Sequence, residues 1–232
     1  CTFSGTQILK FSIIGCDFIQ SFFYGSQMIQ TEFSHCSFEE AVFKNTEFID
    51  VDLTRVGLDY AVLDAVSFTR PILPFWGVLR SYGGLNALSQ QPKEIQIKYS
   101  TLSREISATE FLSKLESLQA YFYKKGQYFV LANVCIFLGK QMDALTYILE
   151  GLQQSIQARD FRTIRHLCEL ASKNRFFTKK QLRQLYDLLT SEDATSNMNY
   201  YEYRLYLAEI QEIKRLLVEN PFGLPRMRLI IQ

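Results

Sequence analysis

Basic side chains gather between residues 159 and 183, where eight lysines and arginines stand against two acids. Arg162 and Arg165 are three residues apart and can share one face of a helix. Such a group could bind an anionic partner: nucleic acid, a nucleotide or an acidic protein. The alternative, a solvated helix face, is favoured because the chain carries no nucleic-acid-binding motif. The eight residues are Arg159, Arg162, Arg165, Lys173, Arg175, Lys179, Lys180 and Arg183.

Residues arranged for catalysis are harder to find. The chain has no Walker loop, no GxGxxG after a strand, no GxSxG elbow and no HExxH. Its two histidines, His35 and His166, fall in segments with different sequence patterns. We therefore predict no catalytic residues, no cofactor and no enzymatic activity. An enzyme that these motifs miss would need a pocket with converging polar groups where two domains meet.

The five cysteines are an odd number without a CxxC pair, which argues against both a disulfide framework and a zinc site. We expect no metal and a reducing cytoplasm. The longest apolar run, "YFVLANVCIFLG", is shorter than the ~18–20 residues that span a bilayer and contains Asn133, so no membrane contact is expected. The chain begins at Cys1 without a Met or a leader, and we expect it to be part of a longer protein.

Charge divides the chain into two parts. Residues 1–70 hold nine acids and four bases, a net charge of −5, and the remainder holds fifteen acids and twenty-one bases, a net charge of +6. Different partners, or different architectures, are therefore expected for the two parts.

A large apolar residue recurs at every fifth position of the first part. A small residue stands two positions before nearly all of them, Phe11 being the exception. Alternation along an extended backbone points residues i and i−2 to the same side, so each five-residue unit directs one large and one small side chain inward. The large residues are Phe3, Ile8, Ile13, Phe18, Phe23, Met28, Phe33, Phe38, Phe43, Phe48, Leu53, Leu58, Leu63 and Phe68.

This pattern over residues 1–69 resembles the pentapeptide-repeat family. The resemblance implies a right-handed quadrilateral β-helix with four units in each coil. Phe33, Phe38, Phe43 and Phe48 would then face inward from four different walls, and Cys16 and Cys36 would be compact inward fillers.

If four units close one coil, residues twenty apart lie above one another and the outward residues can be sorted by wall. Two walls are apolar, which indicates an interface with the chain's own helices, with a second copy or with another protein. Two others are acidic, with Asp17, Glu39, Glu40 and Asp59 on one and Glu32 and Asp52 beside Arg55 on the next. Those acids could mimic DNA phosphates or, the favoured interpretation, keep the domain soluble. The apolar residues are Leu9, Ile29, Ile49, Phe22, Tyr24, Val42 and Val62.

Beyond Phe68 the sequence predicts a cap and then helices. Ile72, Leu73, Phe75 and Trp76 are expected to cover the end of the β-helix within a linker over residues 70–92. From Pro92 the pattern is helical, and Ser107 with Glu110 forms a capping box. Further helices are predicted over 159–173, 178–190 and 197–218.

One helical pair resembles the tetratricopeptide repeat, in which small residues let two antiparallel helices approach closely. The resemblance gives residues 93–232 as a tetratricopeptide-like α-helical domain. Its signature positions here are Tyr128, Leu131, Ala132, Cys135, Gly139, Ala144, Ile148 and Gly151.

Two scaffold folds in one chain favour binding over catalysis. We therefore predict a cytoplasmic, bacterial, non-enzymatic protein-interaction module, serving as the sensor or assembly region of a larger protein. The alternative follows from the pentapeptide resemblance, because some members of that family imitate DNA and act on DNA gyrase. Those members are generally longer and more acidic than this first part.

Overall fold

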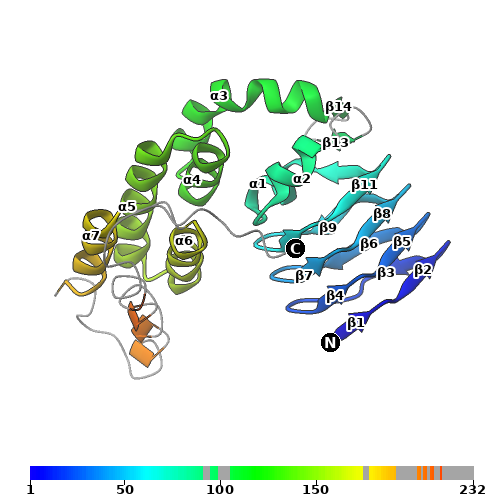
Figure 1. The fold of residues 1–232 in the computed structure, drawn as a ribbon, viewed down its shortest axis with the longest axis horizontal. Helices are drawn as coiled ribbons and strands as arrows, with labels where there is room; N and C mark the ends of the chain where they lie inside the picture. Colours follow the sequence, from blue (N-terminus) through cyan, green and yellow to red (C-terminus); the bar gives the residue numbers. More distant parts are fainter. Residues whose placement is uncertain are drawn as a thin grey trace. The chain divides into compact units, whose positions relative to one another are not determined.

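The computed structural model describes residues 1–90, 95–98, 105–174 and 178–191, together with seven residues between 203 and 215 (Figure 1). The chain divides into two compact units, Cys1–Gln119 and Ala120–Gln232, and each is described by itself. None of the helices in the described ranges is long and apolar enough to cross a membrane.

Short parallel strands, one in most five-residue units, build the first unit. They form three sheets with the orders β1-β4-β7-β10, β2-β5-β8-β11 and β3-β6-β9-β12-β13-β14. From β1 to β12, paired residues in the parallel sheets are twenty apart, as in Phe3↔Phe23↔Phe43, except at a bulge where Ser34 pairs with Arg55. The strands are β1 (Thr2–Ser4), β2 (Gln7–Leu9), β3 (Ser12–Ile14), β4 (Phe22–Tyr24), β5 (Gln27–Ile29), β6 (Glu32–Ser37), β7 (Val42–Lys44), β8 (Glu47–Ile49), β9 (Asp52–Gly57), β10 (Val62–Asp64), β11 (Ser67–Thr69) and β12 (Ile72–Pro74).

The fourth wall contains turns and the ends of the two longer strands, β6 and β9. Backbone hydrogen bonds still join its successive levels, for example from Phe18 N–H to Ser37 O at 2.7 Å and from Phe38 N–H to Gly57 O at 2.8 Å. Four walls therefore enclose one core, as the pentapeptide-repeat resemblance implied.

The core consists of the residues that recur every five positions. Phe33, Phe38, Phe43 and Phe48 are all buried, which confirms that this row faces inward. The small inward hydroxyls are also satisfied: Thr46 Oγ1 donates to Phe23 O at 3.0 Å, and Thr31 Oγ1 donates to Ile8 O at 3.2 Å. A carbonyl twenty-three residues earlier thus accepts from each hydroxyl, so burying it leaves no unpaired donor.

All units but the one that ends at Arg55 end in a corner whose residue has a left-handed backbone. Gly5, Gly15 and Gly25 have φ between 55° and 65°, and ten other corners in this region use residues such as Asn45 and Asp50. His35 lies at one of these exposed corners, as expected. The left-handed residue turns the chain so that the next inward pair points into the same core.

The C-terminal end of the β-helix is closed by α1 (Phe75–Arg80) and α2 (Gly84–Gln90) (Figure 1). Phe75 is buried there, as the predicted cap requires. Ile72 and Leu73 do not belong to the cap, because they lie in β12, where Leu73 occupies one more inward position. The fivefold period therefore continues to Leu73, five residues beyond the predicted last unit.

Pro92, from which the helical pattern was predicted, lies outside the described residues, and the next described segment is not helical. Instead, β13 (Gln96–Lys98) extends the third sheet parallel to β12, and β14 (Glu105–Ser107) pairs antiparallel with β13. Ile95 and Ile97 are buried while Gln96 and Lys98 are half-buried, an alternation typical of a strand.

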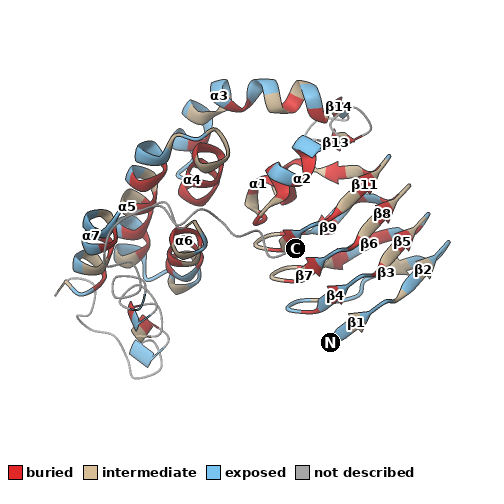
Figure 2. Cartoon of the chain, viewed as in Figure 1, coloured by how far each residue is buried: buried red, intermediate tan, exposed pale blue. Residues whose placement is uncertain are grey.

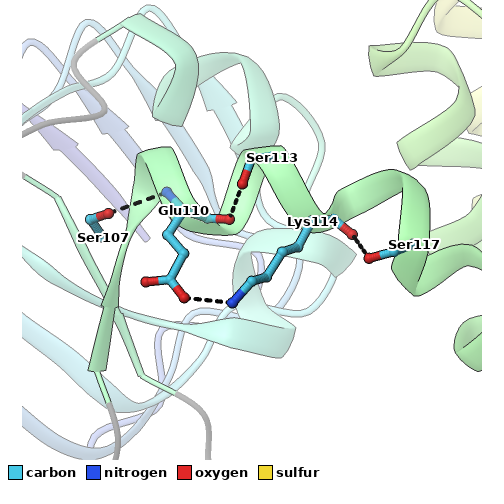
Figure 3. Close-up of polar contacts among 5 residues, drawn as sticks. All are labelled: Ser107, Glu110, Ser113, Lys114 and Ser117. Atoms are coloured by element: carbon cyan, nitrogen blue, oxygen red, sulfur yellow. Dashed lines mark hydrogen bonds and ion pairs between the residues drawn. The ribbon is translucent and has the colours of Figure 1, made fainter.

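The helix α3 (Ala108–Lys124) follows β14 directly. The Oγ of Ser107 accepts a hydrogen bond from the backbone N–H of Glu110 at 3.2 Å, which is one of the two hydrogen bonds of the predicted capping box (Figure 3). The carboxylate of Glu110 pairs with Lys114, one turn further along α3. This pair favours the helix in the orientation in which the acid precedes the base.

In the second unit, α4 (Tyr128–Phe137) and α5 (Gln141–Ala158) form the predicted hairpin, with Gly139 in a left-handed conformation between them. Tyr128 at the start of α4 accepts a hydrogen bond from Gln154 late in α5 at 2.7 Å, so the two helices are antiparallel.

The helices α6 (Phe161–Lys173) and α7 (Lys179–Leu189) confirm two further predicted helices. Both pack on α5. Most of the predicted helix over 197–218 lies outside the described residues, and the seven described there are helical.

Candidate interaction surfaces

A column of outward aliphatic side chains runs along the sheet formed by β2, β5 and β8. Leu9 pairs with Ile29 and Ile29 pairs with Ile49, so the three stand in direct register. Leu9 is 47% exposed, whereas Ile29 and Ile49 are half-buried. Beside this column, Gln7 donates to Gln27 at 2.9 Å and Gln27 donates to Glu47 at 2.8 Å. These side-chain hydrogen bonds join successive coils beside the apolar column.

The neighbouring sheet of β1, β4, β7 and β10 carries the second predicted apolar group. Phe22 and Tyr24 are exposed, and their rings stack with centroids 6.2 Å apart. Val42 and Val62 continue the Phe22 column in register and are half-buried. Two adjoining walls therefore present apolar side chains at neighbouring levels.

The first coil adds exposed apolar residues that the fivefold pattern does not assign to a surface. Phe11 is 65% exposed, and Ile14 and Ile19 are exposed as well. Cys16 is exposed and not the buried filler expected, whereas Cys36 is buried one coil further on. Cys16 is exposed because it lies in the first coil, which has no other coil above it within the described structure. The sequence held one signal of this exposed apolar surface, because Phe11 stands at a position that usually holds a small residue.

Basic residues neutralise part of the acidic surface. Arg70 makes two hydrogen bonds to Asp50, at 2.7 and 2.8 Å, and this pairing holds the pKa of Asp50 below its usual value. Arg80 of α1 pairs with Asp59 at 3.0 Å, and Lys44 lies 3.8 Å from Asp64. The wall that carries Asp59 was predicted to hold four acids, and Arg80 of α1 supplies a base beside them. The first unit therefore presents less unpaired negative charge than its composition indicates.

The eight predicted basic residues are distributed over two helices and the turns beside them. Arg162 and Arg165 are exposed on α6, and Lys179, Lys180 and Arg183 are exposed on α7. In the view of Figure 1, α6 and α7 lie on either side of α5. Arg159 has a left-handed backbone at the end of α5, Lys173 pairs with Glu169, and Arg175 lies outside the described residues. The exposed basic residues of α6 and α7 therefore form two separate groups, one on each helix.

Cys135 and His166 of the second unit carry groups that can be reactive, and both side chains are buried among the helices. Burial raises the pKa of the Cys135 thiol to about 11, which keeps it protonated and unreactive near neutral pH. His166 is buried on α6, with Nδ1 3.6 Å from Glu169 and its ring edge-on to Phe129.

The predicted interaction residues all lie on exposed or half-buried walls and helix faces, apart from the undescribed Arg175.

Comparison with known proteins finds a family match within the first unit. Residues 31–70 match the model for pentapeptide repeats, in eight copies. No curated protein matches the chain. Two structures of trypsin-treated QnrB1, a plasmid-mediated fluoroquinolone resistance protein, are similar to 31% of it. Their TM-scores are 0.30 and 0.19, with identities of 20% and 15%.

The matches span 37% and 48% of the two QnrB1 chains, less than half of either. The register of twenty residues, the buried large residue of every unit from Phe23 onward and the family match over 31–70 agree with one another. The N-terminal part of this chain is therefore a pentapeptide-repeat β-helix, and a helical region follows it.

Proposed function

We propose that this chain is a non-enzymatic protein-binding module whose β-helix docks a partner protein on its apolar walls. The observation that carries the proposal is the register of Leu9, Ile29 and Ile49 on one sheet, beside the exposed Phe22 and Tyr24 on the next. Exposed apolar side chains that adjoin on a rigid surface are typical of protein interfaces. Large aromatic side chains contribute most when a partner desolvates them.

The β-helix suits this role because its backbone is fixed by hydrogen bonds between coils. Each outward side chain of β5 has a neighbour above and below at a set register, so little freedom is lost when a partner binds. The exposed arginines and lysines of α6 and α7 are a second candidate surface, for an acidic partner.

Replacing Ile29 with Glu is expected to weaken partner binding at least tenfold, because a carboxylate would have to be desolvated in the middle of the apolar column. The partner is first captured by a photo-reactive amino acid at position 29 of the full chain. Its affinity for the wild-type chain and for the Ile29→Glu variant is then measured by calorimetry.

A matched control is Gly57→Glu, which adds the same charge to an exposed position on another wall. A Cβ at Gly57 would make only ordinary contacts, the nearest at 3.6 Å from Ser37 Oγ. Both variants should keep the circular dichroism spectrum of the wild type. Equal affinity of the two variants for the partner would refute docking on this wall, and unfolding of Ile29→Glu would mean that the side chain is part of the core.

DNA mimicry is the competing function, and the paired acids argue against it. Asp50, Asp59 and Asp64 each have a basic partner, which interrupts any continuous row of negative charge. We therefore expect no change in the supercoiling of plasmid DNA by gyrase, with or without a fluoroquinolone, at a large excess of this protein. Inhibition of supercoiling, or protection from the drug, would favour mimicry over the docking role.

A further inference from the structure

Three tyrosines lie in contact in the second unit, one from the end of α3, one from α4 and one from α5. The ring centroid of Tyr123 on α3 is 6.1 Å from that of Tyr128 on α4 and 6.0 Å from that of Tyr147 on α5, with interplanar angles of 81° and 53°. The last turn of α3 is mostly exposed, whereas the start of α4 is buried (Figure 2). Tyr123 is 50% exposed, so this group, which we call the tyrosine cluster, presents one ring to solvent and holds it against two others.

One face of α5 adds acidic side chains to the tyrosine cluster. Spacings of four, three and four residues place four polar side chains on this face: Asp143, Tyr147, Glu150 and Gln154. Gln154 donates to the Tyr128 hydroxyl at 2.7 Å, so the face is turned toward the other tyrosines. Burial raises the pKa of Tyr128 and of Tyr147, and the negative charge of Glu150 raises both further. Glu150 is half-buried and makes no ion pair with any residue that the structure describes.

Aromatic ring faces and carboxylates both attract cations. The face of a tyrosine ring is electron-rich, and a cation within about 6 Å of its centre is attracted to it. Of the two cationic side chains, arginine suits such a place better, because its planar guanidinium stacks on a ring and is more weakly hydrated than an ammonium. Its N–H groups can also pair with a carboxylate at the edge of the ring. A partly exposed tyrosine beside Glu150 therefore favours arginine over lysine.

The same chain places two of its own arginines in such surroundings. Arg80 lies 5.0 Å from the centre of the Trp76 ring and pairs with Asp59 at 3.0 Å. Arg183 lies 5.6 Å from the centre of the Tyr186 ring and pairs at 2.9 Å with the aspartate one turn further along α7. Both sites combine an aromatic ring with a carboxylate, and the tyrosine cluster offers the same combination.

We propose that the tyrosine cluster binds an arginine side chain of a partner protein, with the guanidinium on the exposed face of Tyr123 and its N–H groups directed at Glu150. Residues 108–158, which include all of α3, α4 and α5, contain no arginine, so these helices cannot supply the side chain themselves. Lys124 follows Tyr123 directly on α3 and therefore points about 100° away from it. This site lies in the second unit and does not depend on the apolar walls of the first.

The test uses N-acetyl-arginine N-methylamide as the probe and the full 232-residue chain with carbon-13 in its tyrosine rings. The NMR signal of Tyr123 is identified by its loss in the Tyr123→Leu variant. We expect this signal to shift as the probe is added and to saturate in the millimolar range. The matching citrulline compound, in which a neutral urea replaces the guanidinium, should bind at least about fivefold more weakly because it lacks the charge.

Two variants test the groups that hold the guanidinium. Glu150→Gln keeps the size of the side chain and removes its charge, and it should weaken binding of the arginine probe about fivefold. Tyr123→Leu removes the ring face and should weaken binding about threefold or more, as read from the Tyr147 signal. The matched control is Tyr121→Leu, because Tyr121 is 45% exposed on the same turn of α3 and its ring packs on Phe122. This control should leave the affinity unchanged, and all variants should keep the circular dichroism spectrum of the wild type.

Four outcomes overturn the proposal. The first is a Tyr123 signal that does not shift with the arginine probe at concentrations up to about 100 mM, where even a single cation–ring contact beside a carboxylate is populated. Equal affinity for the citrulline compound would show that charge is not recognised. Equal affinity for the corresponding lysine compound would overturn the assignment to arginine. An equal loss in Tyr121→Leu and Tyr123→Leu would place the binding on the end of α3, away from the tyrosine cluster.

Discussion

The Phe43→Ala variant is expected to lower the free energy of unfolding of the β-helix by about 3–5 kcal/mol. The Phe43 ring is fully buried and stacks on Phe23 with centroids 4.9 Å apart. It also meets Phe38 and Phe48 edge-on, at 5.4 and 5.3 Å. Hydrogen-bonded strands hold the four walls at fixed spacing, so the cavity left by the ring cannot close.

Chemical denaturation gives the total loss of stability, and hydrogen exchange of peptides from residues 31–70 assigns it to the β-helix. Phe11→Ala is the matched control, because it removes the same atoms from a side chain that is 65% exposed. Its effect should stay within about 0.5 kcal/mol. Similar losses in both variants would contradict the distinction between inward and outward aromatics on which the fold rests.

Much of the β-helix follows from spacing alone because one local rule repeats. A large residue at i and a small one at i−2 face the same side of an extended backbone, and the corner residue returns the chain to the same core. The register of twenty then places outward residues in columns, which is why Leu9, Ile29 and Ile49 were predicted together. Ion pairs such as Asp50 with Arg70 obey the same spacing. They could therefore have been read from the sequence.

The end of the β-helix could not be placed as well, because two patterns overlap there. Leu73 continues the fivefold period, yet Pro71 and Pro74 beside it resemble the start of a loop. The short segment "IQIK" was read as helical although Ile95 and Ile97 alternate with polar residues. This segment forms a strand because it pairs with β12 in the third sheet. A pairing strand so distant along the chain leaves little trace in the local sequence.

The exposure of the first coil in the described structure was not predicted, for a related reason. The sequence gives Phe3, Ile8, Ile13 and Phe18 the same pattern as the units that follow, and pattern alone treats all coils alike. Burial depends on what lies above and below, and only the structure shows that the first coil lacks one of these neighbours within the described residues. The basic residues of α6 and α7 show the opposite case. They are close in sequence, but their two helices separate them.

Gly151 lies where α5 is in close contact with α4 and α6, and its neighbours leave no room for a side chain. A Cβ there would be 2.6 Å from Tyr128 Cβ and 2.9 Å from Leu167 Cδ1. Tyr128 cannot turn away, because its Cβ is fixed to the backbone of α4 and its hydroxyl accepts from Gln154 at 2.7 Å. The glycine therefore sets the distance of α5 from both α4 and α6, the role that the tetratricopeptide resemblance assigns to a small residue.

Replacing Gly151 with Val is expected to cost the second unit about 3 kcal/mol or more, because the added methyl groups force α4 and α6 away from α5. The better helix propensity of Val offsets this by at most a few tenths of a kcal/mol. The exposed Gln153 of α5 supplies the control. Gln153→Val should cost only about 0.5 kcal/mol through propensity. Hydrogen exchange of peptides from α4, α5 and α6 measures both effects. If Gly151→Val protects these helices as well as Gln153→Val does, the close approach at Gly151 is not what holds them together.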